Sequence, residues 1–335
     1  MNTTNLISFV DSHAAGCPIR VLTGGIPPLR GATMLDKMLD MQKNHDALRV
    51  MTMCEPRGHR QMVGAVLTEP VSPEADVGVF YIDPGWYAPM CGAGAIALSR
   101  VLVEMGLVPI REPVTRVRMD TPAGIVDGYA QVENGAVRKV WFQNVDSFVY
   151  RTDLELEFHG KKVTYDITYG GNFFVSLPVG QFGLELVPEN SGRLADLGME
   201  LLREINRQVE VVHPRHPGIT FLNDIQFTQP ALEQGGEKVY RNTVIFGAGQ
   251  TDRSPCGTGS CARMAALYRR GELALGETFI HESIMGTRFY GKVLSAREED
   301  GCCYVACQLS GEPHITAMGH FVADQNDGVS PGFLL

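Results

Sequence analysis

A seven-residue motif, C-G-x-G-x-x-A, occurs twice in the chain. Its copies cover residues 91–97 and 256–262, so their cysteines stand 165 residues apart in a chain of 335. A glycine follows each cysteine after 15 residues, Gly106 in the first half and Gly271 in the second. Because glycine commonly ends helices, each motif is predicted to open a helix of the same length. The repeat therefore predicts two similar halves, each with one cysteine at a helix N-terminus.

Strand patterns outnumber helical patterns in the rest of the chain. Residues 33–42 carry methionines and leucines at helical spacing, and residues 194–209 form a second clear helical stretch. The methionine stripe is typical of core packing. Short apolar runs, among them Leu48–Cys54 and Val77–Ile82, predict strands. Strand-rich halves with one prominent helix each favour an α+β fold over alternating βαβ units.

The chain is acidic, with a formal net charge of −9. It has no run of lysine and arginine of the kind that binds nucleic acid or an anionic membrane. No apolar stretch approaches the ~18 residues of a membrane-spanning helix, and the first ten residues do not resemble a signal peptide. We therefore expect a cytoplasmic protein without a nucleic-acid or membrane partner. Its eight cysteines are expected to be free thiols.

A cysteine at a helix N-terminus has a distinctive chemistry. The uncovered backbone N–H groups and the helix dipole stabilise the thiolate, which lowers the thiol pKa. The same N–H groups can bind a carboxylate, and glycines allow a ligand to approach closely. Two such helix starts facing each other would hold a carboxylate and place one sulfur on each face of the adjacent carbon. That arrangement suits removal of a Cα proton on one face and its return on the other.

At these residues the chain resembles the proline racemase family, which includes hydroxyproline 2-epimerases and related dehydratases. The resemblance runs over nearly the whole chain, and the second cysteine motif is its most specific part. The residues that carry it are Asp11-Ser12-His13, Gly16, Pro18, Arg20-Val21, Thr23-Gly24-Gly25-Ile26-Pro27, Met90-Cys91-Gly92, Gly170-Gly171-Asn172-Phe173 and Asp252-Arg253-Ser254-Pro255-Cys256-Gly257-Thr258-Gly259.

The resemblance implies a two-base reaction that needs neither pyridoxal phosphate nor another cofactor or metal. Cys91 and Cys256 would be the bases, one starting as a thiolate and the other as a thiol. Asp252 would bind the ring amine of an imino acid substrate. The substrate carboxylate would meet backbone N–H groups at the two helix starts, those of Gly92, Ala93, Gly257 and Thr258.

The resemblance also implies the fold of the diaminopimelate epimerases. That fold has two similar halves, each a curled sheet around a central helix, with the active site between them. The first half is expected to comprise residues 1–145 and 312–335, and the second residues 146–311, since the C-terminal strand would return to the first half. The protein is expected to be a monomer or a homodimer.

Two positions depart from the family pattern. Ala93 stands where the family usually has histidine, and Cys17 stands where it usually has glutamate. The backbone N–H at Ala93 is kept, but a side-chain contact to the substrate ring or its hydroxyl would be lost. The expected activity is 4-hydroxyproline 2-epimerase, with proline racemase second and trans-3-hydroxyproline dehydratase third. Dehydratases carry Ser or Thr at the position of Cys91, which favours racemase or epimerase chemistry.

Other interpretations use the same residues. Residues 92–97 fit the dinucleotide fingerprint G-x-G-x-x-A, with Glu112 about 20 residues later. A loop over residues 83–89 separates that motif from the preceding strand, and a nucleotide site leaves the second cysteine motif unexplained. A family member that binds its ligand without catalysis is the alternative from another class. The cysteines outside the two motifs are expected to be structural: Cys17, Cys54, Cys261, Cys302, Cys303 and Cys307.

Overall fold

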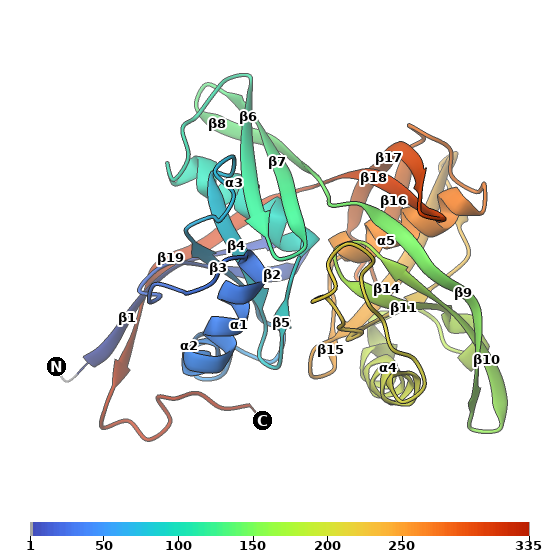
Figure 1. Ribbon diagram of the computed structural model, residues 1–335, viewed down its shortest axis with the longest axis horizontal. Coiled ribbons are helices and arrows are strands. Elements are labelled where there is room, and N and C mark those ends of the chain that lie inside the picture. The colour runs from blue at the N-terminus through green and yellow to red at the C-terminus, as the bar shows by residue number, and fades with distance from the viewer. Residues whose placement is uncertain (1–2, 335) are drawn as a thin grey trace. The chain divides into compact units, whose positions relative to one another are not determined.

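The computed structural model describes residues 3–334 (Figure 1). The chain divides into two compact units. The first comprises residues 1–142 and 312–335, and the second residues 143–311. Residues 143–145 thus belong to the second unit rather than to the first, where the sequence analysis expected them.

The first unit is built on a sheet with three helices. The sheet order is β19-β1-β2-β3-β4-β6-β7, and β2–β3 and β4–β6 are its parallel pairs. Its elements are β1 (Thr3–Ala14), β2 (Cys17–Gly24), α1 (Met34–Asn44), α2 (Asp46–Met53), β3 (Val63–Thr68), β4 (Val77–Ile82), β5 (Tyr87–Ala88), α3 (Gly92–Glu104), β6 (Val114–Thr121), β7 (Gly124–Glu133), β8 (Ala136–Gln143) and β19 (Pro313–Asp324).

Helix α3 is the centre of this unit. It contacts β19 and β1 at one end of the strand order and β7 at the other, so the sheet curls around it. Eleven of its thirteen residues are buried. An apolar helix of this kind is stable only inside a core, because it has no polar face to turn to water.

Methionines fill the space between α1, α2 and the sheet. Met34, Met38 and Met41 are at most 3% exposed, which confirms that the methionine stripe is core, whereas Leu39 is 41% exposed. The prediction of a strand over Leu48–Cys54 is wrong, since this segment lies in α2.

The physical reason lies in the spacing of polar groups in α2. Asp46, in its first turn, pairs with Arg49 three residues later, at 2.7 Å. The Thr52 hydroxyl donates to the carbonyl of Leu48, four residues back, at 2.7 Å. These are helical contacts, and they outweigh the strand preference of the β-branched Val50 and Thr52.

The second unit repeats the plan of the first. Its sheet order is β9-β10-β11-β12-β14-β16-β17-β18, and β18 pairs again with β9, so the sheet closes. Its elements are β9 (Ser147–Phe158), β10 (Lys161–Tyr169), β11 (Phe173–Pro178), η1 (Val179–Phe182), η2 (Pro188–Asn190), α4 (Ser191–Asn206), β12 (Asp224–Thr228), β13 (Leu232–Gln234), β14 (Glu237–Phe246), β15 (Gln250–Thr251), α5 (Gly257–Arg269), β16 (Phe279–Glu282), β17 (Arg288–Glu299) and β18 (Cys302–Gly311).

Helix α5 lies inside this closed sheet and contacts β9, β10, β17 and β18. Both units run through the same series of pairings, with antiparallel pairs at the ends and parallel pairs at matching places: β2–β3 and β11–β12, then β4–β6 and β14–β16. The predicted duplication and the α+β fold class are confirmed.

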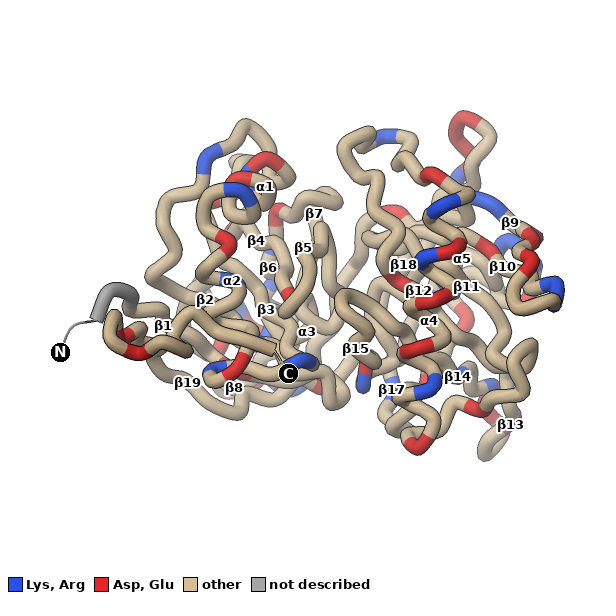
Figure 2. The backbone as a smooth tube through the Cα atoms, turned by 90° about the horizontal axis from the view of Figure 1, so that it is seen from below, with Lys and Arg blue, Asp and Glu red and all other residues tan. Residues whose placement is uncertain are grey.

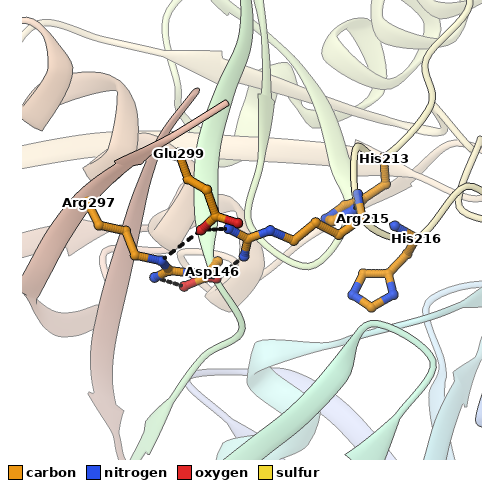
Figure 3. Close-up of polar contacts among 6 residues, drawn as sticks. All are labelled: Asp146, His213, Arg215, His216, Arg297 and Glu299. Carbon is orange, nitrogen blue, oxygen red and sulfur yellow. Dashed lines mark hydrogen bonds and ion pairs between the residues drawn. The ribbon is translucent and has the colours of Figure 1, made fainter. Parts of the chain in front are cut away.

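A charged network holds the loop of residues 207–223, which leads into β12 (Figure 3). Arg215 of this loop donates to the Asp146 carboxylate at 2.9 Å and is also paired with Glu299. Arg297 donates to the same Asp146 carboxylate at 2.9 Å. The loop is thereby tied to β17 and to the segment before β9 without regular secondary structure of its own.

Acidic and basic residues are interspersed along the backbone of both units (Figure 2). None of the helices within residues 3–334 combines the length and the apolar character needed to cross a membrane.

Candidate active site

The two motif cysteines occupy the same structural position in their units. Cys91 is the N-cap of α3 and Cys256 is the N-cap of α5. Each sulfur accepts a hydrogen bond from the backbone N–H three residues on, Gly94 or Gly259, at 3.3 Å. The prediction that each motif opens a helix is confirmed, and both helices are thirteen residues long.

Backbone N–H groups at both helix starts are available to a ligand. Within residues 3–334, no acceptor lies within hydrogen-bond distance of the N–H groups of Gly92 and Ala93 in α3 or of Gly257 and Thr258 in α5. The first turn of a helix leaves such groups unpaired and carries the positive end of the helix dipole. Each of the two starts can therefore bind an anionic group such as a carboxylate.

Asp252 lies beside the cysteine of the second unit. Its side chain is 7% exposed, and one carboxylate oxygen accepts from both the N–H and the hydroxyl of Ser254, each at 2.8 Å. The Ser254 hydroxyl oxygen in turn accepts from the N–H of Cys256 at 3.1 Å. Burial raises the pKa of Asp252 to about 6, although the Ser254 hydrogen bonds oppose that shift.

The environment of Cys256 corrects one sequence prediction. The helix start was expected to lower the pKa of the thiol, but the pKa of Cys256 lies well above its usual value. Burial is the largest cause, and the negative charges of Asp252 and Asp224 add to it. The Gly259 N–H and the Thr258 hydroxyl stabilise the thiolate but do not offset burial. At neutral pH Cys256 is therefore a thiol.

Apolar side chains surround Cys256, and of these the sequence analysis singled out only Ala262, the last residue of the second motif. Phe174, Val244 and Ala262 are buried against it, and the partly buried Phe246 packs on the same cluster. Phe174 directly follows one of the resemblance motifs, which is the only signal that pointed near it. These side chains form the apolar surroundings that desolvate the Cys256 thiol.

The two departures from the family pattern lie in the first unit. Ala93 is in the first turn of α3 and is 2% exposed. Cys17 begins β2 and is 4% exposed. Neither supplies a charged group, so any polar contact made by the usual histidine or glutamate is lost here.

The dinucleotide interpretation gains no support from Glu112. Its carboxylate accepts the N–H of Gly135 at 2.7 Å, so it caps a hairpin turn rather than standing ready for a ribose. The described residues also contain no group of three His, Cys, Asp or Glu side chains arranged to hold a metal ion.

Comparisons with known proteins identify the family of the chain. The model of the family described as proline racemase matches residues 9–334. A proline racemase of Clostridioides difficile is 40% identical over 336 residues, covering 100% of both chains. A 4-hydroxyproline 2-epimerase of Streptosporangium roseum is also 40% identical over 336 residues with the same coverage.

A solved structure is also similar to this chain over its whole length. The hydroxyproline epimerase of Agrobacterium vitis, solved with bound trans-4-hydroxy-L-proline, superposes with a TM-score of 0.94 at 29% identity. The match covers 100% of this chain and 96% of the other. Sequence and structure together show that the chain belongs to the proline racemase family.

Proposed function

We propose that this protein is a cofactor-independent 4-hydroxyproline 2-epimerase that inverts Cα through Cys91 and Cys256. The observation that carries the proposal is the repeated helix start, with a sulfur at the N-cap and two unpaired N–H groups behind it. Inversion of a carbon needs one group to remove a proton and another to supply one from the opposite face. Each unit provides one such group.

The ionisation of Cys256 assigns the starting roles. Because burial keeps Cys256 protonated, it would act as the acid and Cys91 would begin as the thiolate. The Cys91 sulfur takes the Cα proton, and Cys256 delivers its own proton to the same carbon from the other face. The product leaves Cys91 as the thiol and Cys256 as the thiolate, so the reverse reaction uses the opposite roles.

The helix starts would stabilise the charge that develops during proton removal. As the Cα proton leaves, negative charge spreads onto the substrate carboxylate. N–H groups of Gly92, Ala93, Gly257 and Thr258 are fixed before the reaction begins, so they do not need to reorganise. Preorganised donors of this kind are typically the largest single contribution to catalysis.

Asp252 would couple substrate binding to the ionisation of Cys256. Its charge is one of the causes that raise the Cys256 pKa. A cationic ring amine bound at Asp252 would offset that charge, so the pKa of Cys256 would fall when substrate is present. The free energy needed to ionise the Cys256 thiol during turnover would then be smaller.

The choice of 4-hydroxyproline rests on the structural likeness to the hydroxyproline epimerase solved with trans-4-hydroxy-L-proline. Proline racemase is the second candidate, because the relative from Clostridioides difficile is equally similar and because Ala93 offers no polar side chain for a ring hydroxyl. A trans-3-hydroxyproline dehydratase is disfavoured because Cys91 is a cysteine rather than the Ser or Thr of that group.

Chiral chromatography separates these candidates. The protein is incubated in turn with trans-4-hydroxy-L-proline, L-proline and trans-3-hydroxy-L-proline. The proposal expects cis-4-hydroxy-D-proline from the first at a kcat/KM well above that for D-proline formation. A preference for L-proline would replace it with a racemase, and loss of water from the third substrate would replace it with a dehydratase. Absence of all three products would favour a binding protein.

A further inference from the structure

Cys256 has a backbone conformation that its counterpart lacks. Its φ is +61° and its ψ is 114°, whereas Cys91 has φ −140° and ψ 115°. Residues with a Cβ rarely adopt a positive φ, because the conformation is strained. It persists only where the surroundings hold it, so the contacts around the peptide that links Pro255 and Cys256 have to supply that restraint.

Three buried side chains form hydrogen bonds to the peptide that links Pro255 and Cys256, at its carbonyl and at its N–H. The Pro255 carbonyl accepts from Asn242 Nδ2 at 3.0 Å and from Ser260 Oγ at 3.2 Å. The Cys256 N–H donates to Ser254 Oγ at 3.1 Å. Asn242, Ser254 and Ser260 are all 0% exposed. Rotation of the peptide would break all three hydrogen bonds where no water can replace them.

The hydroxyl of Ser260 has a further partner in His281 of β16. His281 Nδ1 lies 2.8 Å from Ser260 Oγ, and the histidine is 0% exposed. Ser260 has only one hydroxyl proton, which is used on the Pro255 carbonyl. The contact with His281 is therefore satisfied when Nδ1 carries the proton and donates to Ser260 Oγ. That tautomer leaves Nε2 as an acceptor, and Nε2 has no partner within the described residues.

Asn242 and His281 are positioned by two strands that are distant in sequence from Cys256. Asn242 lies in β14 and His281 in β16, and these strands form a parallel pair in which Tyr240 stands opposite His281. Both side chains thus come from neighbouring strands of the closed sheet around α5. Burial holds the pKa of His281 well below its usual value, so the ring is neutral and can keep one fixed tautomer.

We propose that His281 is a positioning residue, which acts through Ser260 to hold the strained Pro255–Cys256 peptide and so aims the Cys256 sulfur. The relay runs from His281 Nδ1–H to Ser260 Oγ, and from the Ser260 hydroxyl to the Pro255 carbonyl. Without it the peptide keeps only the hydrogen bonds to Asn242 and Ser254, so it relaxes more readily toward the extended conformation of Cys91. The sulfur would then move away from the Thr258 hydroxyl, which lies 3.7 Å from it and favours the thiolate, and which has no counterpart at Ala93.

Two variants of similar side-chain shape test whether the Nδ1–H donor of His281 is needed. His281→Asn keeps an N–H donor near the position of Nδ1. His281→Leu has a side chain shaped like that of asparagine but has no donor. The readout is the rate of Cys256 alkylation by iodoacetamide across pH 6–10, followed by mass spectrometry of the Cys256 peptide. We expect a rate about tenfold lower at pH 8 in His281→Leu, a loss of about one pKa unit of thiolate stabilisation. His281→Asn should stay within about threefold of the wild type.

Ser260→Ala removes only the hydroxyl and serves if His281→Leu does not fold. It should slow alkylation by the same factor, and the double variant Ser260→Ala/His281→Leu should be no slower than either alone. His213→Leu is the matched control, because His213 is a buried histidine of the same unit that is not bonded to α5. It should lower the melting temperature and leave the alkylation profile unchanged.

Activity gives the second readout, and only this part rests on the proposed function. In His281→Leu and Ser260→Ala, kcat should fall about 10- to 100-fold, as expected for a small misplacement of a reacting group, while KM changes little. Equal alkylation in His281→Leu and wild type would overturn the proposal, as would an equal loss in His281→Leu and His281→Asn. A wild type inactive on imino acids would refute the proposed function but leave the alkylation test valid.

Discussion

The start of α3 and the start of α5 are built from the same motif, yet they hold their cysteines differently. Each sulfur accepts one N–H three residues on, at the same 3.3 Å. Cys91 is partly exposed and has an ordinary extended backbone, whereas Cys256 is buried and has a positive φ. At the second start the carboxylate of Asp252 is tied to the cysteine through Ser254.

The difference teaches that one motif in one structural position can hold its cysteine in two environments. The motif alone gives each half a thiol, two free N–H groups and a central helix. Burial and the nearby negative charges then keep Cys256 protonated. A reaction with one acid and one base needs one cysteine protonated and the other ionised at the start. Burial already favours the protonated form of Cys256, whereas two cysteines in equal environments would differ only after substrate had bound.

The largest expected effect comes from removing either sulfur. Cys91→Ser and Cys256→Ser should each lower the rate of epimerisation by at least about 1000-fold, since a hydroxyl is a far weaker base than a thiolate at neutral pH. Chiral chromatography measures the loss, and Cys302→Ser, on β18, is the control that should remain active. If one of the two motif variants keeps wild-type activity, the two halves do not share the reaction.

Asp252→Asn tests how the charge of Asp252 affects the ionisation of Cys256 and the binding of substrate. The amide keeps an oxygen to accept from Ser254 but has no charge, so the Cys256 pKa should fall and alkylation by iodoacetamide should become faster. At the same time kcat/KM should fall about 100-fold, because the charged partner of the ring amine is lost.

The pH profile checks the same residue in the wild type. Asp252 has a pKa of about 6, so kcat/KM should decline as the pH falls through 6 and the carboxylate becomes protonated. The variant should lack this acid limb. A limb of equal size in both proteins would assign the titration to another group.

Two glycine variants compare how tightly each helix start is packed. A Cβ at Gly94 would lie 2.3 Å from Cε1 of the buried Tyr81 ring, whereas one at Gly259 would lie 3.0 Å from Gln226 Nε2 and from the Cys256 sulfur. Gly94→Ala should therefore cost about 1–3 kcal/mol of stability from overpacking, and Gly259→Ala less. Thermal unfolding measures both, with Gly192→Ala as the control because nothing lies within 4 Å of its Cβ. A larger loss in Gly259→Ala would reverse the comparison.

The smallest expected effect concerns the loop of residues 207–223 in the second unit. Burial lowers the pKa of His213 to about 4, and its Nδ1 accepts the N–H groups of Arg215 and His216 at 3.1 Å. The unfolded chain then binds more protons than the folded one between about pH 6.5 and pH 4, so stability falls as the pH falls through that window. The melting temperature should drop by a few degrees from pH 7 to pH 5, and less in His213→Asn. An equal drop in both would place the titrating group elsewhere.

The sequence pattern predicted the parts that are local and repeated. The cysteine motifs and their closing glycines placed α3, α5 and both N-caps, because capping and helix length depend on residues close in sequence. The pattern failed at Leu48–Cys54, where apolar and β-branched residues fit a strand and the helical contacts of Asp46 and Thr52 decided the outcome.

The hydrogen bonds that hold the Pro255–Cys256 peptide could not be predicted from the sequence. Asn242, Ser260 and His281 lie on three separate elements, and no spacing connects them until the sheet closes around α5. A positive φ at a cysteine carries no sequence signal, unlike one at glycine. The raised pKa of Cys256 depends on burial, which the helix-start argument did not include.

Proton NMR in deuterated water tests the central claim, that two thiols exchange the Cα proton with solvent. The protein is added to trans-4-hydroxy-L-proline, and the α-proton signal is followed with time. The account expects that signal to disappear while cis-4-hydroxy-D-proline appears with deuterium at Cα, and it expects neither change in Cys256→Ser. Epimer formation with the α-proton retained, or an α-proton signal that persists with both trans-4-hydroxy-L-proline and L-proline, would contradict it.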